Sequence, residues 1–167
     1  MYRPDQWHDF FMMVGGAAAA LTGLVFVALS LNLGVILGDA THRSRSIGTL
    51  TGFAGIFVIC ALVLMGGQSH VAVGVEWLAV SSAAGFVYLR PLPRLRRANP
   101  TTLTTVRLIT GGTLYAAQIV GAGLVLLDAT AGLYVAASAM AVLTVYSVTG
   151  AWLLLVGAHD DTNHQAV

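Results

Sequence analysis

The sequence predicts an all-α integral membrane protein, a helical bundle of five transmembrane helices with its N-terminus outside the cell and its C-terminus in the cytoplasm. Of the 167 residues, 57% are hydrophobic and 9% are charged, whereas soluble domains contain about 25% charged residues. The apolar residues form five long runs, and the arginines gather in the segments that connect the runs on one side. This composition excludes a soluble domain and a nucleic-acid partner, which requires a basic face.

Each apolar run is long enough to cross a bilayer, because a helix needs about 20 residues to span a hydrocarbon core. Backbone polar groups in lipid must be satisfied within the segment, so we expect helices. The whole chain, residues 1–167, is predicted to be one transmembrane domain. Its spans are predicted at about residues 10–37, 47–67, 71–89, 108–127 and 131–158.

The first and last runs exceed the length that a bilayer requires. Each has 28 residues, which corresponds to about 42 Å of helix. We expect these two helices to tilt, to kink or to project beyond the membrane. In the first run, Gly15–Gly16 is the predicted weak point.

The connections predict the orientation in the membrane. Residues 68–70 and 128–130 are such short connections that the helices on either side must form antiparallel hairpins. Segment 38–46 contains two arginines and segment 90–107 contains five, whereas the other side has only Arg3. Positively charged loops stay in the cytoplasm, so segments 38–46 and 90–107 are predicted to be cytoplasmic. The chain uses arginine and no lysine and is rich in Ala, Gly and Val, which is typical of a GC-rich bacterial genome. We therefore expect a bacterial protein of the cytoplasmic (inner) membrane.

Small residues recur at a spacing of four, which allows helices to approach closely in lipid. Two interpretations are open: these faces pack within one bundle, or one of them joins subunits of a homo-oligomer or binds a larger membrane partner. The sets are Gly15, Ala19 and Gly23; Gly48 and Gly52; Gly112 and Ala116; Ala117 and Gly121; Gly132 and Ala136; and Ala137 and Ala141.

Two polar residues inside the spans are the predicted transport, proton or cation site. Glu76 is the only acid well inside a span, about 10 Å along its helix, with no arginine placed to neutralise it. A charged side chain at that depth is costly, so Glu76 either carries protons or cations or is protonated and ties helices together. In the second case its expected partner is Gln118 or a hydroxyl of the last helix. Gln118 lies near the middle of the fourth span, where an amide bridges helices or lines a path.

A polar cluster is predicted at the outer face, near Glu76. Imidazoles and carboxylates together are able to bind a divalent cation or to relay protons, but their spacing here matches no metal-binding motif. We therefore expect no metal and no cofactor. The residues of this cluster are His8, Asp9, Gln68, His70 and Asp128.

Enzyme signatures are missing from the sequence. Residues 67–70 lack the final glycine of the Gly-x-Ser-Gly motif of rhomboid proteases, and no pair of intramembrane aspartates is present. We therefore expect a protein that is not an enzyme.

Five arginines of segment 90–107 are predicted to contact the headgroups of anionic membrane lipids. A basic side chain beside an anionic leaflet is worth about 1 kcal/mol. In the alternative interpretation, these charges only set the topology. The residues are Arg90, Arg94, Arg96, Arg97 and Arg107.

Several segments resemble a family of small bacterial polytopic membrane proteins of no established function. Some of its members carry the label of modulator of a membrane-anchored AAA protease, so the resemblance implies a protease partner and no catalytic residues. The family has an acid after its final apolar run, where this chain has Val156-Gly157-Ala158. The resembling segments are Trp7-His8-Asp9-Phe10-Phe11, residues 16–33, Gly67-Gln68-Ser69, Gly74-Val75-Glu76 and Gly132-Leu133-Tyr134.

Two functions remain open at this stage. The first is a homo-oligomeric channel or transporter-like assembly for protons or small cations, which the unpaired Glu76 favours. The alternative is an accessory or regulatory subunit that binds a larger membrane protein, such as a membrane protease. The low polar content of the spans favours this alternative.

Overall fold

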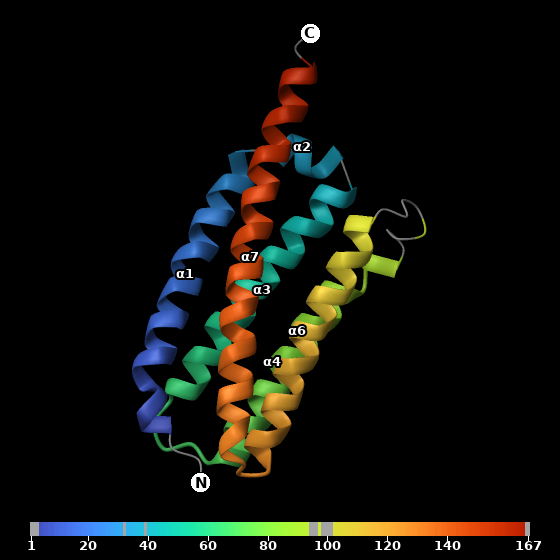
Figure 1. Ribbon diagram of the computed structural model, residues 1–167. Helices are drawn as coiled ribbons and strands as arrows, with labels where there is room; N and C mark the ends of the chain where they lie inside the picture. The colour runs from blue at the N-terminus through green and yellow to red at the C-terminus, as the bar shows by residue number, and fades with distance from the viewer. Residues whose placement is uncertain (1–3, 32, 39, 94–96, 98–101, 166–167) are drawn as a thin grey trace.

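Five long helices make up the molecule, as expected for apolar runs that must satisfy their own backbone groups (Figure 1). The computed structural model describes residues 4–31, 33–38, 40–93, 97 and 102–165, and every regular element among them is helical. A 3-10 helix (Pro4–Trp7) precedes the first long helix, and the short helix α2 (Leu33–Gly38) follows it. The long helices are α1 (His8–Leu31), α3 (Ala40–Leu64), α4 (His70–Leu89), α6 (Thr102–Leu126) and α7 (Thr130–Gln165).

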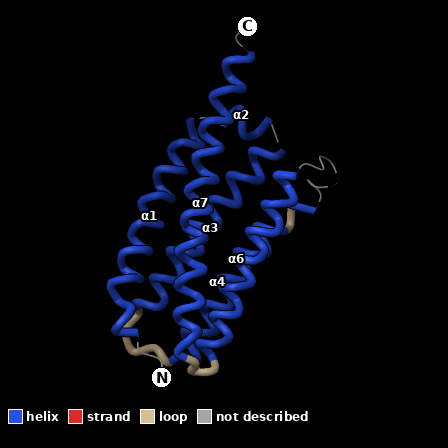
Figure 2. Tube along the Cα trace, viewed as in Figure 1, coloured by secondary structure: helices blue, strands red, loops and turns tan. Residues whose placement is uncertain are grey.

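Each long helix contains a stretch that is long and apolar enough to cross a membrane, which confirms the predicted fold class. The chain is therefore a multi-pass membrane protein. Successive long helices run in opposite directions, and the loops of the described residues lie at the two ends of the bundle (Figure 2). The candidate spans are His8–Leu31, His42–Leu64, His70–Leu89, Thr105–Leu126 and Thr130–Trp152.

Four of the helices form the centre of the bundle, and α1 lies at its side (Figure 1). Helix α6 packs extensively against α4 and α7, and α3 packs against α1, α4 and α7. Helix α1 packs mainly on α3 and touches α7 only lightly. Most of α1 therefore faces outward from the bundle.

The predicted weak point in the first run is wrong. Helix α1 continues regularly through Gly15 and Gly16, and it ends at Leu31. A Cβ atom on Gly15 would lie 2.8 Å from Cβ of Cys60, so this glycine allows α1 to approach α3 closely. The excess length of the run is taken up by α2 at the end of α1.

Two helices begin earlier than predicted. Helix α3 starts at Ala40 and α6 at Thr102, so residues 40–46 and 102–107, expected in loops, are helical. Hydropathy marks the part of a helix that lies in hydrocarbon, whereas the backbone hydrogen bonds continue through its polar first turns. Helix α7 continues to Gln165 and projects beyond its neighbours, as expected from its long apolar run (Figure 1).

The helix ends follow from local chemistry. Helix α4 ends at Leu89, shortly before Pro91 and Pro93, which cannot continue a helix. It begins after Ser69, whose hydroxyl accepts a hydrogen bond from the backbone N–H of Ala72. The preceding turn contains Gly67 at a φ of 80°, a conformation that favours glycine.

Small residues bring α6 and α7 together, as the spacing of four predicts. A Cβ atom on Gly121 would lie 2.6 Å from Cβ of Ala136 and 2.8 Å from its backbone nitrogen. In α1, by contrast, Ala19 and Gly23 are exposed, and only Gly15 of that set packs inside the bundle. The internal interpretation therefore holds for the α6–α7 contact, and the outer face of α1 is left uncovered.

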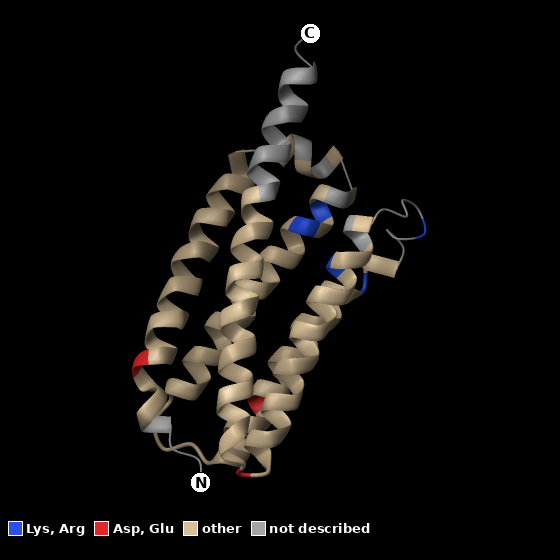
Figure 3. Ribbon diagram, in the orientation of Figure 1, with Lys and Arg blue, Asp and Glu red and all other residues tan. Residues whose placement is uncertain are grey.

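The charged residues that are coloured in Figure 3 lie at opposite ends of the bundle, with the arginines at one end and the acids at the other. We call these the arginine end and the acidic end. The arginine end holds Arg43, Arg45, Arg90, Arg97 and Arg107. The acidic end holds Asp9, Glu76 and Asp128. Which end faces the cytoplasm stays a prediction.

Candidate functional site

Glu76 binds a residue of the turn before its own helix. The amide nitrogen Nε2 of Gln68 donates to the carboxylate of Glu76, at 3.1 Å from Oε2 and 3.4 Å from Oε1. The expected partner, Gln118 or a hydroxyl of the last helix, is therefore wrong. Helix α4 begins so close to Glu76 that the preceding turn lies within reach of the carboxylate. Both side chains are half-buried, so Glu76 lies near the acidic end rather than sealed in the core.

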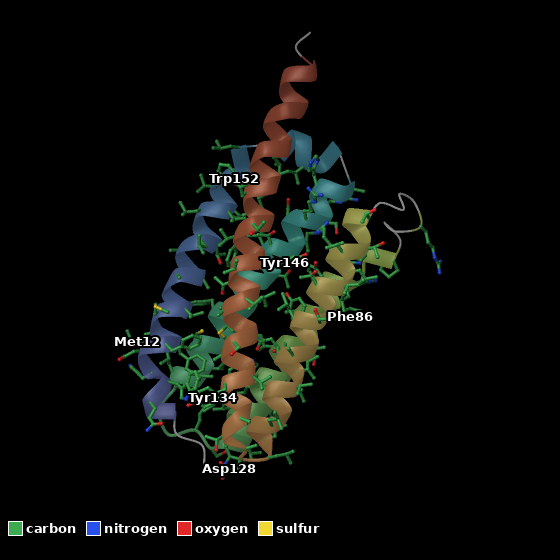
Figure 4. All side chains as sticks on the ribbon, in the orientation of Figure 1. Met12, Phe86, Asp128, Tyr134, Tyr146 and Trp152 are labelled. Carbon is green, nitrogen blue, oxygen red and sulfur yellow. The ribbon has the colours of Figure 1, made fainter. Side chains whose placement is uncertain are left out.

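The remaining residues of the predicted outer-face cluster are spread over the acidic end. His8 and Asp9 are exposed at the start of α1, Asp128 is exposed in the α6–α7 turn, and His70 is half-buried at the start of α4. Figure 4 shows Asp128 at the tip of that turn. Among the described residues, no three His, Cys, Asp or Glu side chains are arranged to hold a metal ion. The structure thus joins Gln68 to Glu76 by hydrogen bonds.

Gln118 bridges two helices in the core. Its Oε1 accepts a hydrogen bond of 2.8 Å from the indole Nε1 of Trp77, which joins α6 to α4. Both side chains are 1% exposed. The amide nitrogen Nε2 of Gln118 has no hydrogen-bond partner in the protein. The bridge to Trp77 therefore uses the amide oxygen of Gln118 and leaves both N–H donors of its amide nitrogen available.

Three residues that line one small cavity, which we call the inner cavity, each have a buried polar group without a hydrogen-bond partner in the protein. The groups are Oγ of Ser81, the hydroxyl of Tyr115 and Nε2 of Gln118. An unpaired buried polar group costs about 1–3 kcal/mol. The inner cavity has a volume of about 10 Å³, which accommodates a single water molecule that is able to bond to these groups.

A wider pocket adjoins the inner cavity toward the arginine end, and we call it the outer pocket. It has a volume of about 200 Å³ and lies between α3, α4, α6 and α7. Tyr115 and Leu143 line both spaces, which makes them neighbours. The outer pocket is lined by Arg45, Gly48, Thr49, Tyr88, Val106, Arg107, Tyr115, Leu143, Tyr146, Ser147, Thr149 and Gly150.

Three tyrosines from three helices meet at the outer pocket. The hydroxyl of Tyr88 donates to the backbone carbonyl of Arg107 at 3.0 Å, and it lies 2.7 Å from the hydroxyl of Tyr146. Because the single proton of Tyr88 goes to the carbonyl, Tyr146 is the donor in the second bond. The ring of Tyr115 lies 5.5 Å from that of Tyr88, between centroids. Figure 4 shows Tyr146 on α7, in the half of the bundle toward the arginine end.

Sequence analysis missed this tyrosine group. The signal was present, because Tyr88, Tyr115 and Tyr146 each bring a hydroxyl into a span composed mostly of aliphatic residues. Their meeting depends on how α4, α6 and α7 are rotated about their axes. Glycines help to create the space: a Cβ atom on Gly48 would lie 3.0 Å from the ring of Tyr88.

The structure describes three of the five arginines that are predicted to bind lipid headgroups. Arg90 and Arg97 are exposed, and the guanidinium of Arg90 lies 5.7 Å from the centre of the Phe86 ring. Arg107 is half-buried and lines the outer pocket. Arg94 and Arg96 lie outside the described residues. Lipid contact by all five arginines stays a prediction.

Comparison of the chain with family models, curated proteins and solved structures finds no match. The resemblance to the family with a protease partner therefore stays a prediction.

Proposed function

We propose that the protein is a non-enzymatic transport protein of the bacterial cytoplasmic membrane, in which the path for the transported species runs inside the bundle of each chain. The observation that supports this most is the inner cavity. Ser81, Tyr115 and Gln118 line one space inside an apolar bundle, and each has a buried polar atom without a hydrogen-bond partner in the protein. A homo-oligomer of this protein then contains one path per subunit rather than one path shared at the symmetry axis.

Of the expected species, protons suit the interior better than metal cations do. Arg45 and Arg107 line the outer pocket, and their charge raises the energy of a metal cation there. An excess proton has the same sign of charge, but it needs no set of coordinating oxygens, because hydroxyl groups and water pass it along hydrogen bonds. Tyr146, Tyr88 and Tyr115 supply hydroxyls at this point, and the inner cavity follows.

The barrier on this path is the bond between Trp77 and Gln118. It joins Gln118, which lines the inner cavity, to the helix that carries Glu76 at the acidic end. Trp77 and Glu76 are neighbours in sequence on α4, so a small movement of this helix changes both. A closed barrier of this kind favours controlled transport over an open pore.

The test is proton flux into proteoliposomes that contain the purified protein, measured with an internal pH-sensitive dye. We expect Glu76→Gln to reduce the flux at least tenfold without changing assembly, because the amide keeps the size of the side chain and cannot ionise. The matched control is Asp9→Asn, which neutralises an exposed acid at the same end. Flux of Glu76→Gln at the wild-type rate and pH dependence refutes the proposal.

The second candidate is an accessory subunit of a larger membrane protein, and the outer face of α1 favours it. Gly16 and Gly23 are exposed, and a Cβ atom on either would have nothing within 4 Å. In lipid, such small residues let another helix approach closely. We expect Gly23→Leu to abolish co-purification with a membrane-anchored AAA protease, whereas Ala141→Leu, on the exposed side of α7, leaves it intact. Equal recovery with both variants removes this candidate.

A further inference from the structure

The outer pocket has its positive charges on the side of the arginine end. Arg45 comes about one helical turn before Thr49 in α3, and Arg107 comes about two turns before Tyr115 in α6. All four residues line the same space. A ligand that enters from the arginine end therefore meets Arg45 and Arg107 before it meets Thr49 and Tyr115.

The rest of the wall is mainly apolar. Val106, Leu143, Gly48, Gly150 and the tyrosine rings provide the apolar part of this wall, and Thr49, Ser147 and Thr149 add hydroxyl groups. An ion with several charges, such as phosphate, would leave oxygens unpaired against this wall, which is costly. A ligand with a single negative charge and an apolar body is complementary to the pocket, because the charge pairs with the arginines and the body packs against the apolar wall.

The size of the pocket limits the apolar body. Its volume of about 200 Å³ is slightly larger than a cavity of about 150 Å³ that holds benzene. A ring or a short branched chain fits within it, whereas a long acyl chain must leave most of its length outside.

We propose that the outer pocket binds a small monocarboxylate with a compact apolar body of about the size of benzoate. The carboxylate binds at Arg45 and Arg107, and the body packs against Leu143 and the tyrosine rings. Guanidinium groups form the strongest hydrogen bonds to carboxylates, which gives the site its preference for an anion.

This inference deepens the proposed function and rests on it for the transport step, but binding itself does not require transport. One carboxylate carries one negative charge, so movement with one proton is electrically neutral. A small monocarboxylate is then the solute that is transported together with the proton. The inner cavity adjoins the outer pocket, where this solute binds.

Binding is tested by calorimetric titration of the purified full-length protein in detergent. The probe is benzoate, and the matched ligands are benzylamine, with the opposite charge, and benzyl alcohol, with none. Laurate is the fourth ligand, because a fatty acid from the bilayer supplies the same carboxylate. We expect benzoate to bind at least tenfold more tightly than the first two. Benzylamine or benzyl alcohol binding as tightly as benzoate overturns the role of the arginines, and laurate binding without benzoate binding overturns the compact body.

Variants locate the site. We expect Arg107→Gln to weaken benzoate binding at least tenfold, which is the loss of one charge-assisted hydrogen bond. Arg43→Gln is the matched control, because this exposed arginine lies at the same end, changes the net charge equally and does not line the pocket. If both variants bind benzoate as the wild type does, the assignment is wrong.

A second pair of variants keeps both arginines, so it remains informative if Arg107→Gln fails to fold. Val106 is 52% exposed at the rim, and Val106→Trp narrows the entrance. Ile109→Trp, one helical turn away and 60% exposed, does not reach the pocket. We expect only Val106→Trp to lose benzoate binding, and equal affinities overturn the proposal.

The two proposals fail separately. Benzoate binding with no proton flux contradicts the proposed transport function and leaves the carboxylate site in place. Proton flux that neither requires nor responds to benzoate, in a protein that does not bind it, contradicts the carboxylate site alone.

Discussion

Replacing Gly121 by alanine tests how closely α6 and α7 approach. The added Cβ atom would lie 2.6 Å from Cβ of Ala136 and 2.8 Å from its backbone nitrogen. The backbone contact cannot be relieved by rotating a side chain, so the helices must separate. Overpacking costs about 1–3 kcal/mol, and alanine regains up to about 1 kcal/mol of helix propensity over glycine. Subtracting about 1 kcal/mol of propensity leaves an expected net loss of up to about 2 kcal/mol in the free energy of unfolding.

The matched control lies two residues farther along α6. Gly123 has nothing within 4 Å of its Cβ position, so Gly123→Ala should leave stability unchanged or raise it slightly. Both variants are compared by denaturant unfolding in mixed micelles, monitored by circular dichroism. Combining Gly121→Ala with Ala136→Gly should restore only part of the loss, because the backbone contact remains. Equal stability of the two single variants refutes the close contact between α6 and α7.

Three further predictions concern the tyrosine group, the orientation and the lipids. Tyr88→Phe removes two hydrogen bonds and should cost about 1 kcal/mol in the same unfolding assay; Tyr134→Phe, which is exposed, should cost nothing measurable. A cysteine at Ser69 should react with an impermeant thiol reagent added outside the cell, and a cysteine at Pro93 should not; the reverse pattern inverts the predicted topology. Neutralising three loop arginines should weaken retention of anionic lipid in native mass spectrometry, and unchanged retention contradicts the predicted headgroup contacts. The substitutions are Arg94→Gln, Arg96→Gln and Arg97→Gln.

The spans could be predicted because they depend on one property of local sequence. A run of apolar residues in lipid has to be helical, and Pro91 and Pro93 mark where α4 stops. The polar starts of α3 and α6 could not be predicted from hydropathy. Residues such as Arg43 and Arg45 are compatible with both a helix and a loop, and the difference depends on contacts beyond the local segment.

The candidate site was only partly predictable for a similar reason. Composition identifies Glu76 and Gln118 as unusual for their depth, but it does not identify their partners. Gln68 reaches Glu76 because the turn folds back over the start of α4, and Trp77 reaches Gln118 because two helices are rotated toward each other. Both depend on backbone geometry that no spacing rule in a single sequence contains.

The four-helix centre has a consequence for how the protein is made. The polar interior is assembled from both hairpins, and Leu143 of α7 helps to enclose the cavity that Ser81, Tyr115 and Gln118 share. Ribosomes add about 5–20 residues per second, so α7 follows the end of α6 by several seconds. During this interval the cavity lacks the part of its wall that α7 provides. Synthesis therefore passes through an intermediate whose polar cavity is incompletely enclosed. We expect insertion chaperones and quality-control proteases to recognise this intermediate.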